Sequence, residues 1–162
     1  MVRTEISLFL KNIPGELGKL SKTLSQAGIN IDALTIQDAS QYVQELFRAR
    51  GKSLKRIAPA ASYGSMRKDS AEFALIRLLV DQTDKAVDLL AKGDYIFDVM
   101  PVIALIIDNK PGTLAKMAET FGRKEININY VYGSALPGGE KSLFIFSPED
   151  IEEAAKLFPE SD

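Results

Sequence analysis

The chain has 162 residues, of which 46% are hydrophobic and 26% are charged, a balance typical of a globular protein that buries a core and stays soluble. Its 20 basic and 22 acidic side chains give a formal net charge of -2, so no overall positive field attracts nucleic acid or an anionic membrane. Cysteine and histidine are both absent, which excludes disulfides, thiolate metal sites and imidazole-based nucleophilic catalysis. We therefore expect no metal, no cofactor and no enzyme activity.

The first residues, Met1–Glu5, begin a charged strand-like run and lack the apolar core and cleavage site of a signal peptide. This predicts a cytoplasmic protein. Even the apolar run Val99–Ile107 is far shorter than the roughly 20 residues that a membrane helix needs. We interpret this run as a buried strand and expect no contact with a membrane.

A repeat without gaps relates residues 12–36 to residues 109–133. Each copy carries an Asn-x-Pro-Gly-x-Leu motif, followed after a fixed interval by an Ile-Asn-Ile triplet. The motif residues are Asn12, Pro14, Gly15 and Leu17 in the first copy and Asn109, Pro111, Gly112 and Leu114 in the second, and the triplets are Ile29–Ile31 and Ile126–Ile128. Two copies of one supersecondary unit account for this pattern.

In chain order, the first copy begins with a strand that places Ile6, Leu8 and Leu10 on one side. After the Pro-Gly turn, apolar residues recur at helical spacing and predict an amphipathic helix. Alternating and continuous apolar runs then predict further strands, with one more helix between the last two. The expected elements are strands over 29–36 and 73–80, a helix over 83–92 and a strand over 95–99.

The second copy repeats this order. Its first strand is the apolar run over 102–107, and the residues after the second Pro-Gly turn again follow helical spacing. Strands over 126–132 and 142–146 flank a Pro-Gly-Gly turn. A helix over 148–158 follows, and the sequence then ends without a further strand.

Strand, helix, strand, strand, helix, strand is the order of a ferredoxin-like α+β module, with an antiparallel sheet and both helices on one face. We expect two such βαββαβ modules, residues 1–100 and residues 101–162, the second lacking its last strand. A missing strand leaves an open sheet edge, and open edges pair readily with other strands. The sequence therefore predicts a homodimer.

A long interval, about residues 40–70, separates the second and third strands of the first module. It is too long for a passive hairpin, and it concentrates lysine and arginine. One interpretation is a solvated excursion with one amphipathic helix. The other is a docking arm for an acidic protein or for nucleic acid. No aromatic platform accompanies the basic residues, so we favour the first interpretation.

The two motifs resemble those of the ACT domain family, in particular of stand-alone proteins with tandem ACT domains. The resemblance rests on finding both motifs twice at equal spacing, and it covers most of the chain outside the insertion and the C-terminal tip. It implies a non-catalytic allosteric sensor of amino-acid metabolism. In this family a free amino acid binds at the interface between two ACT modules.

The resemblance also implies where the ligand lies. Glycine lets a ligand approach the backbone closely, and the first amides of a helix suit a carboxylate. The expected binding residues are Asn12, Pro14, Gly15, Glu16, Leu17, Asn30 and Asp32 in the first module and Asn109, Pro111, Gly112, Thr113, Leu114 and Asn127 in the second. Asp32 and Asp108 could receive the ammonium group. Because Glu16 would repel an anion, we expect the second turn to be the better site.

Other functions fit the same pattern. A regulatory subunit of an amino-acid biosynthetic enzyme, such as acetolactate synthase, would use these modules beside a partner enzyme. A nucleic-acid-binding module would need exposed aromatics, and Phe9 and Phe73 lie among apolar residues that predict a core role. An enzyme would need clustered reactive groups, and the candidates form no cluster in the sequence: Lys19, Lys116, Tyr130 and Tyr132.

Overall fold

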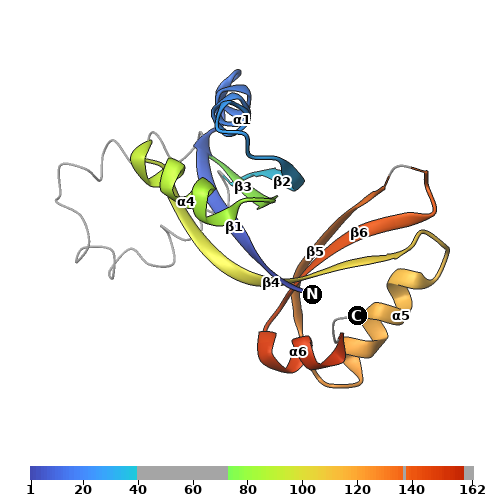
Figure 1. Cartoon of the computed structure of the whole chain (residues 1–162). Coiled ribbons are helices and arrows are strands. Elements are labelled where there is room, and N and C mark those ends of the chain that lie inside the picture. Colours follow the sequence, from blue (N-terminus) through green and yellow to red (C-terminus); the bar gives the residue numbers. More distant parts are fainter. Residues whose placement is uncertain (40–72, 137, 159–162) are drawn as a thin grey trace, which may run out of the picture. The chain divides into compact units, whose positions relative to one another are not determined.

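The computed structural model of the chain describes residues 1–39, 73–136 and 138–158 (Figure 1). The basic insertion expected at about 40–70 lies outside the described residues. The helices and strands follow the predicted order, except that the two strands expected over 95–99 and 102–107 form one continuous strand. They are β1 (Val2–Lys11), α1 (Glu16–Gln26), β2 (Ile31–Asp38), β3 (Phe73–Val80), α4 (Thr83–Lys92), β4 (Ile96–Asp108), α5 (Thr113–Gly122), β5 (Ile128–Ala135), β6 (Lys141–Pro148) and α6 (Ile151–Leu157).

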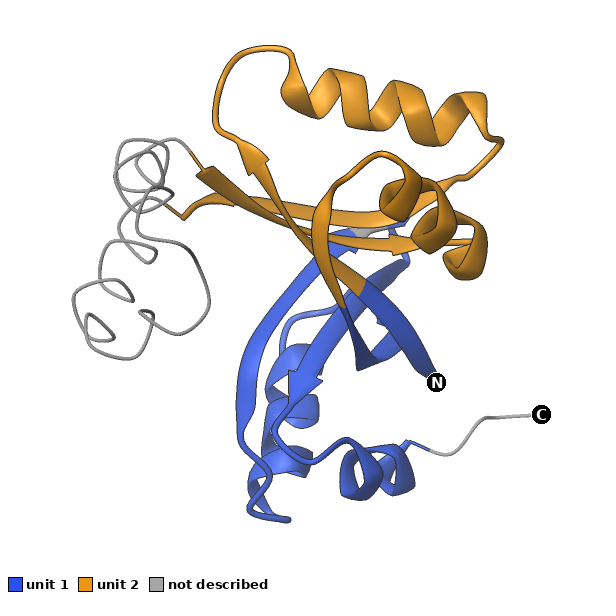
Figure 2. Cartoon of the chain, turned by 90° about the vertical axis from the view of Figure 1, so that its left-hand side faces the viewer, with its two compact units in different colours: residues 1–5, 99–162 blue, residues 6–98 orange. Residues whose placement is uncertain are grey.

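The chain divides into two compact units (Figure 2). Unit 1 comprises residues 1–5 and 99–162, and unit 2 comprises residues 6–98. The strand order is β2-β3-β1-β4-β6-β5, so β1 and β4 each contribute one part to each unit. The modules expected from the repeat, 1–100 and 101–162, differ from these units chiefly in the first five residues.

Unit 2 packs α1 and α4 against one face of its strands, as Figure 2 shows. In β1 the alternate residues Ile6, Leu8 and Leu10 face these helices and are at most 5% exposed. The antiparallel pairing of β1 with β3 places Leu78 opposite Ile6, so both strands supply the same core. Leu20 completes it from α1. Fully burying each such side chain contributes roughly 1.5–3 kcal/mol.

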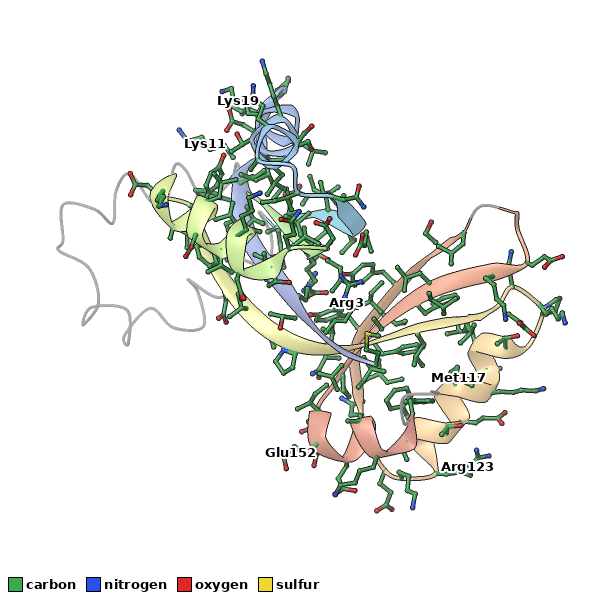
Figure 3. All side chains as sticks on the ribbon, viewed as in Figure 1. Arg3, Lys11, Lys19, Met117, Arg123 and Glu152 are labelled. Atoms are coloured by element: carbon green, nitrogen blue, oxygen red, sulfur yellow. The ribbon has the colours of Figure 1, made fainter. Side chains whose placement is uncertain are left out.

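Unit 1 is built in the same way around aromatic residues. Phe121 of α5 is fully buried, with its ring centroid 5.3 Å from that of Phe146 on β6 and 5.2 Å from that of Phe158. Ile103 of β4 lies opposite Phe146 and joins this cluster. Met117, labelled in Figure 3, packs against it from α5. Each unit therefore has its own core, and the expected ferredoxin-like α+β fold is confirmed.

The second module has no strand of its own after α6 within the described residues. The position beside β4 is instead taken by the N-terminal part of β1, where the Ala104 amide donates to the Met1 carbonyl at 3.0 Å. The edge that the sequence analysis expected to be open is therefore paired. Among the described strands, β2 and β5 form the two edges of the strand order. None of the described helices is long and apolar enough to cross a membrane.

Candidate functional site

The two Pro-Gly turns have the same backbone conformation. Gly15 immediately precedes α1 with φ 95° and ψ -18°, and Gly112 precedes α5 with φ 88° and ψ -11°. Residues with a side chain adopt this left-handed conformation at a cost, whereas glycine adopts it freely. A Cβ atom added at either glycine would have no neighbour within 4 Å. Each turn therefore opens into free space directly in front of a helix.

The amides at these turns are only partly available to a ligand. The Glu16 amide donates to the Ile13 carbonyl at 3.4 Å, and the Thr113 amide donates to the Lys110 carbonyl at 3.2 Å. These two donors, which we expected to hold a carboxylate, are engaged within their own turns. In the described part of the chain, the amides of the flanking residues have no hydrogen-bond acceptor. These residues are Gly15 and Leu17 at the first turn and Gly112 and Leu114 at the second.

Within residues 1–39, 73–136 and 138–158, no side chain caps the N-terminus of either helix at these amides. The leucines of the motif are partly exposed beside them, Leu17 by 36% and Leu114 by 40%. Pro14 and Pro111 are exposed as well. Each turn thus combines unpaired amide donors with an apolar wall, a combination that suits a small carboxylate with an aliphatic part.

The Glu16 carboxylate at the first turn has a cationic partner. Glu16 forms an ion pair with Lys19 one turn later in α1, at 2.5 Å between Nζ and Oε1. The hydrogen bond to Glu16 and its negative charge raise the pKa of Lys19 above its ordinary value. Figure 3 shows Lys19 on α1, and Lys11 at the end of β1 precedes the same turn. Glu16 therefore shares the first turn of the helix with one positive charge, and the expectation that the second Pro-Gly turn is the better site stays a prediction.

At the second turn, the polar residues are bound to the neighbouring hairpin. The side-chain amide of Asn109 donates to the Gly139 carbonyl at 2.9 Å. Asp108 forms ion pairs with Lys141 at 2.6 Å and with Lys110 at 3.5 Å. The hydrogen bond and charge of Lys141, then the charge of Lys110, lower the pKa of Asp108. Asp108, which we considered for the ammonium group, is thus already paired with two cations.

The expected residues of the second motif lie at the other end of each helix. An α-helix of the length of α1 rises about 16 Å, which separates Asn30 from the first turn. Asn30 exchanges hydrogen bonds with Asp81, and its side-chain amide donates to Asp32 at 3.0 Å. Asn127 accepts from the Glu149 amide at 2.9 Å. Within one module, therefore, the turn and the Ile-Asn-Ile triplet do not form one site.

Asn127 lines an open pocket of about 510 Å³ in unit 1, formed where α5 leads to β5 and β6 leads to α6. Its walls are Lys124, Glu125, Ile126, Asn127, Glu149, Asp150, Ile151 and Glu153. Asp150 caps α6 by accepting from the Glu153 amide, so this carboxylate has a structural task. No group of three or more metal-ligating side chains is suitably placed in the described residues.

The structure contains a polar cluster around Glu5 that the sequence did not predict. Glu5 is fully buried, and its carboxyl oxygens accept hydrogen bonds from Tyr130 at 2.5 Å and from Tyr132 at 2.7 Å. Alternation in β1 indicated only that Glu5 faces away from Ile6. Its partners are more than a hundred residues away, and no local pattern could have indicated them.

The two matching Pro-Gly turns and the ferredoxin-like fold are the features expected of ACT modules. The family model for an ACT domain pair matches residues 52–160, which is more than half of the chain. The chain therefore belongs to the ACT domain pair family, as the motifs predicted. No protein of curated function matches its sequence.

Solved structures support the same fold. Protein BT0572 from Bacteroides thetaiotaomicron is 22% identical with a TM-score of 0.70, over 97% of this chain and 86% of that chain. The regulatory subunit of aspartate kinase from Thermus thermophilus is 14% identical with a TM-score of 0.56, over 97% and 92%. Its counterpart from Thermus flavus is 16% identical with a TM-score of 0.53, over 98% and 96%. The comparisons indicate no catalytic family.

Proposed function

We propose that this protein is a non-catalytic allosteric sensor that binds a free amino acid at its Pro-Gly turns, at interfaces between ACT modules. The observation that carries the proposal is the pair of turns with matching backbone angles, each presenting, beside an exposed leucine, amides that have no acceptor among the described residues. The partial positive charge of a helix N-terminus favours the carboxylate of such a ligand. Because Asn30 and Asn127 lie at the opposite ends of the helices, a complete site would need residues from a second module or a second copy.

Thermal unfolding with each common amino acid tests the proposal. A ligand that binds only the folded state at 100 times its Kd stabilises that state by about 2.7 kcal/mol. For a chain of this length, that corresponds to a rise in Tm of about 5–10 °C. We expect at least one amino acid to give such a rise. If none of them raises the Tm, the sensor function is wrong.

Two substitutions locate the binding turn. Asparagine tolerates positive φ better than other side chains, so Gly112→Asn and Gly15→Asn fill the space before each helix with limited backbone strain. We expect at least one of them to abolish the ligand-induced rise in Tm. Gly138→Asn is the matched control, because Gly138 has φ 91° and equally open surroundings in the β5–β6 turn. A rise that survives both turn substitutions would place the ligand elsewhere.

A second candidate function is that of a regulatory subunit that joins an amino-acid biosynthetic enzyme. It is supported by the fold that this chain shares with regulatory subunits of aspartate kinase over most of their length. Acetolactate synthase was the enzyme we considered from the sequence, and it stays a prediction. Stable co-purification with a larger catalytic chain would favour this function, whereas a chain that elutes alone with its ligand would favour the free-standing sensor.

A further inference from the structure

The first five residues, Met1–Glu5, which we call the arm, belong to a different unit from the residues that follow them. They complete the sheet of unit 1 beside β4, while Ile6–Lys11 of the same strand form part of unit 2 (Figure 2). The chain passes from one unit to the other between Glu5 and Ile6. The arm is therefore attached covalently to unit 2 alone, and it is held in unit 1 by noncovalent contacts.

Polar contacts hold both ends of the arm. The Met1 carbonyl accepts from the Ala104 amide at 3.0 Å, and the Met1 amino group donates to the Ala104 carbonyl at 3.4 Å. Met1 is 55% exposed and Val2 is 46% exposed, so about half of each of these apolar residues stays accessible to solvent. Glu5 is the one arm residue that is fully buried.

Glu5 reaches the far edge of unit 1. Tyr130 and Tyr132 lie on β5, and both hydroxyls donate to the Glu5 carboxyl group, one to each oxygen. These three residues, which we call the latch, connect the arm to the strand at the opposite edge of the strand order in that unit. Removing a partner from a buried polar group costs far more than an exposed hydrogen bond contributes. The position of the arm therefore depends strongly on the latch.

We infer that the arm is an exchangeable strand, and that the edge of β4 which it covers is a docking surface for the arm of a second copy of this chain. A strand that replaces the arm must present backbone N–H and C=O groups that can pair with β4. It must also carry a carboxyl group at the position of Glu5. The identical segment of another copy meets both requirements. Exchange of one terminal element between copies preserves every contact inside the unit and changes only which chain supplies the arm.

Glu5→Gln in the full chain tests the latch, since it keeps the shape of the side chain and weakens its acceptance of two hydroxyl donors. We expect hydrogen exchange at the arm amides to become about 10-fold faster or more, with exchange in α5 unchanged. Glu140→Gln removes one charge from an exposed side chain in the same unit and should leave arm exchange as it is. Equal arm exchange in the native chain and Glu5→Gln would overturn the inference.

A peptide of residues 1–6 then stands in for the arm of a second copy. Added to the Glu5→Gln chain, it should perturb NMR signals of Val99–Ala104 and of the two latch tyrosines saturably. The same peptide with glutamine at position 5 should bind at least 10-fold more weakly. If both peptides bind equally, or neither perturbs these signals at millimolar concentration, the inference is wrong.

A third variant distinguishes loss of the latch hydrogen bonds from a general loss of stability in unit 1. Tyr130→Phe with Tyr132→Phe removes both hydroxyl donors, so the native peptide should lose its advantage over the glutamine peptide. Tyr95→Phe removes a hydroxyl from a tyrosine that packs against the core of unit 2 and should preserve that advantage. A preference that persists without both latch hydroxyls would also overturn the inference.

Discussion

Asn12 and Asn109 occupy equivalent positions of the repeat, but their surroundings differ. The Asn109 side chain donates to Gly139 in the β5–β6 turn. Asn12 has no hydrogen bond within the described residues. The sequence could therefore predict that a Pro-Gly turn precedes each of α1 and α5, but not which hydrogen bonds the motif side chains make.

Asp108 provides a test of the charges around the second turn. Lys141, followed by Lys110, lowers the pKa of its carboxyl group from the ordinary value of 3.8. We expect an NMR titration to place the Asp108 midpoint below that value. Lys141→Gln should return the midpoint toward it, whereas Lys156→Gln, which breaks an exposed ion pair with Glu153 on α6, should leave it unchanged.

The sign of the effect on stability follows from the direction of this shift. A carboxyl group whose pKa is lower in the folded state stabilises that state fully above pH 3.8, and the contribution disappears as the pH falls through the lowered pKa. The loss of this contribution to stability should therefore occur below pH 3.8, and it should be smaller in Lys141→Gln than in the native chain. The carboxyl group is exposed, so the effect is small and should weaken further at high salt. An Asp108 midpoint that is the same in the native chain and in Lys141→Gln would contradict this account.

At the scale of elements, periodicity predicted the helices and most strands because each has one apolar face. The role of β1 could not be predicted in this way. Ile6, Leu8 and Leu10 are buried at alternate positions in unit 2, but Glu5, directly before Ile6, is also buried and belongs to unit 1. The partners of Glu5 come from β5, and only the folded chain brings them together. A charged residue at the start of a strand is ordinarily solvated, so nothing in the sequence indicated that Glu5 is buried.

The position of α5 depends on Phe121, which is fully buried between Phe146 and Phe158. Phe121→Ala leaves a cavity in the core of unit 1, and we expect it to lower the free energy of unfolding by about 3–5 kcal/mol. Urea denaturation measures this loss. Leu114→Ala, on the same helix but 40% exposed, should change it by about 1 kcal/mol or less. Similar losses in the two variants would show that α5 is not anchored by its aromatic contact.

At the scale of the whole molecule, the repeat predicted two modules of one kind, and each unit has the expected order of strands and helices. The repeat could not predict that strands are shared. β1 contributes its first residues to unit 1 and the rest to unit 2. β4 contributes Ile96–Asp98 to unit 2 and its remaining residues to unit 1. Such sharing depends on where β1 pairs along β4, and the sequence of either strand alone does not specify that register.

Strand sharing predicts that the two units unfold together. When unit 1 unfolds, β1 and β4 each lose the pairing of one end, and the remaining ends in unit 2 lose their anchors. We therefore expect Phe121→Ala in unit 1 and Leu24→Ala in unit 2, each removing a fully or almost fully buried side chain, to accelerate global hydrogen exchange in both α1 and α5. Coincident changes in the two helices indicate one cooperative transition. Faster exchange confined to the helix of the substituted unit would mean that the shared strands transmit no stability, and that each unit folds as an independent domain.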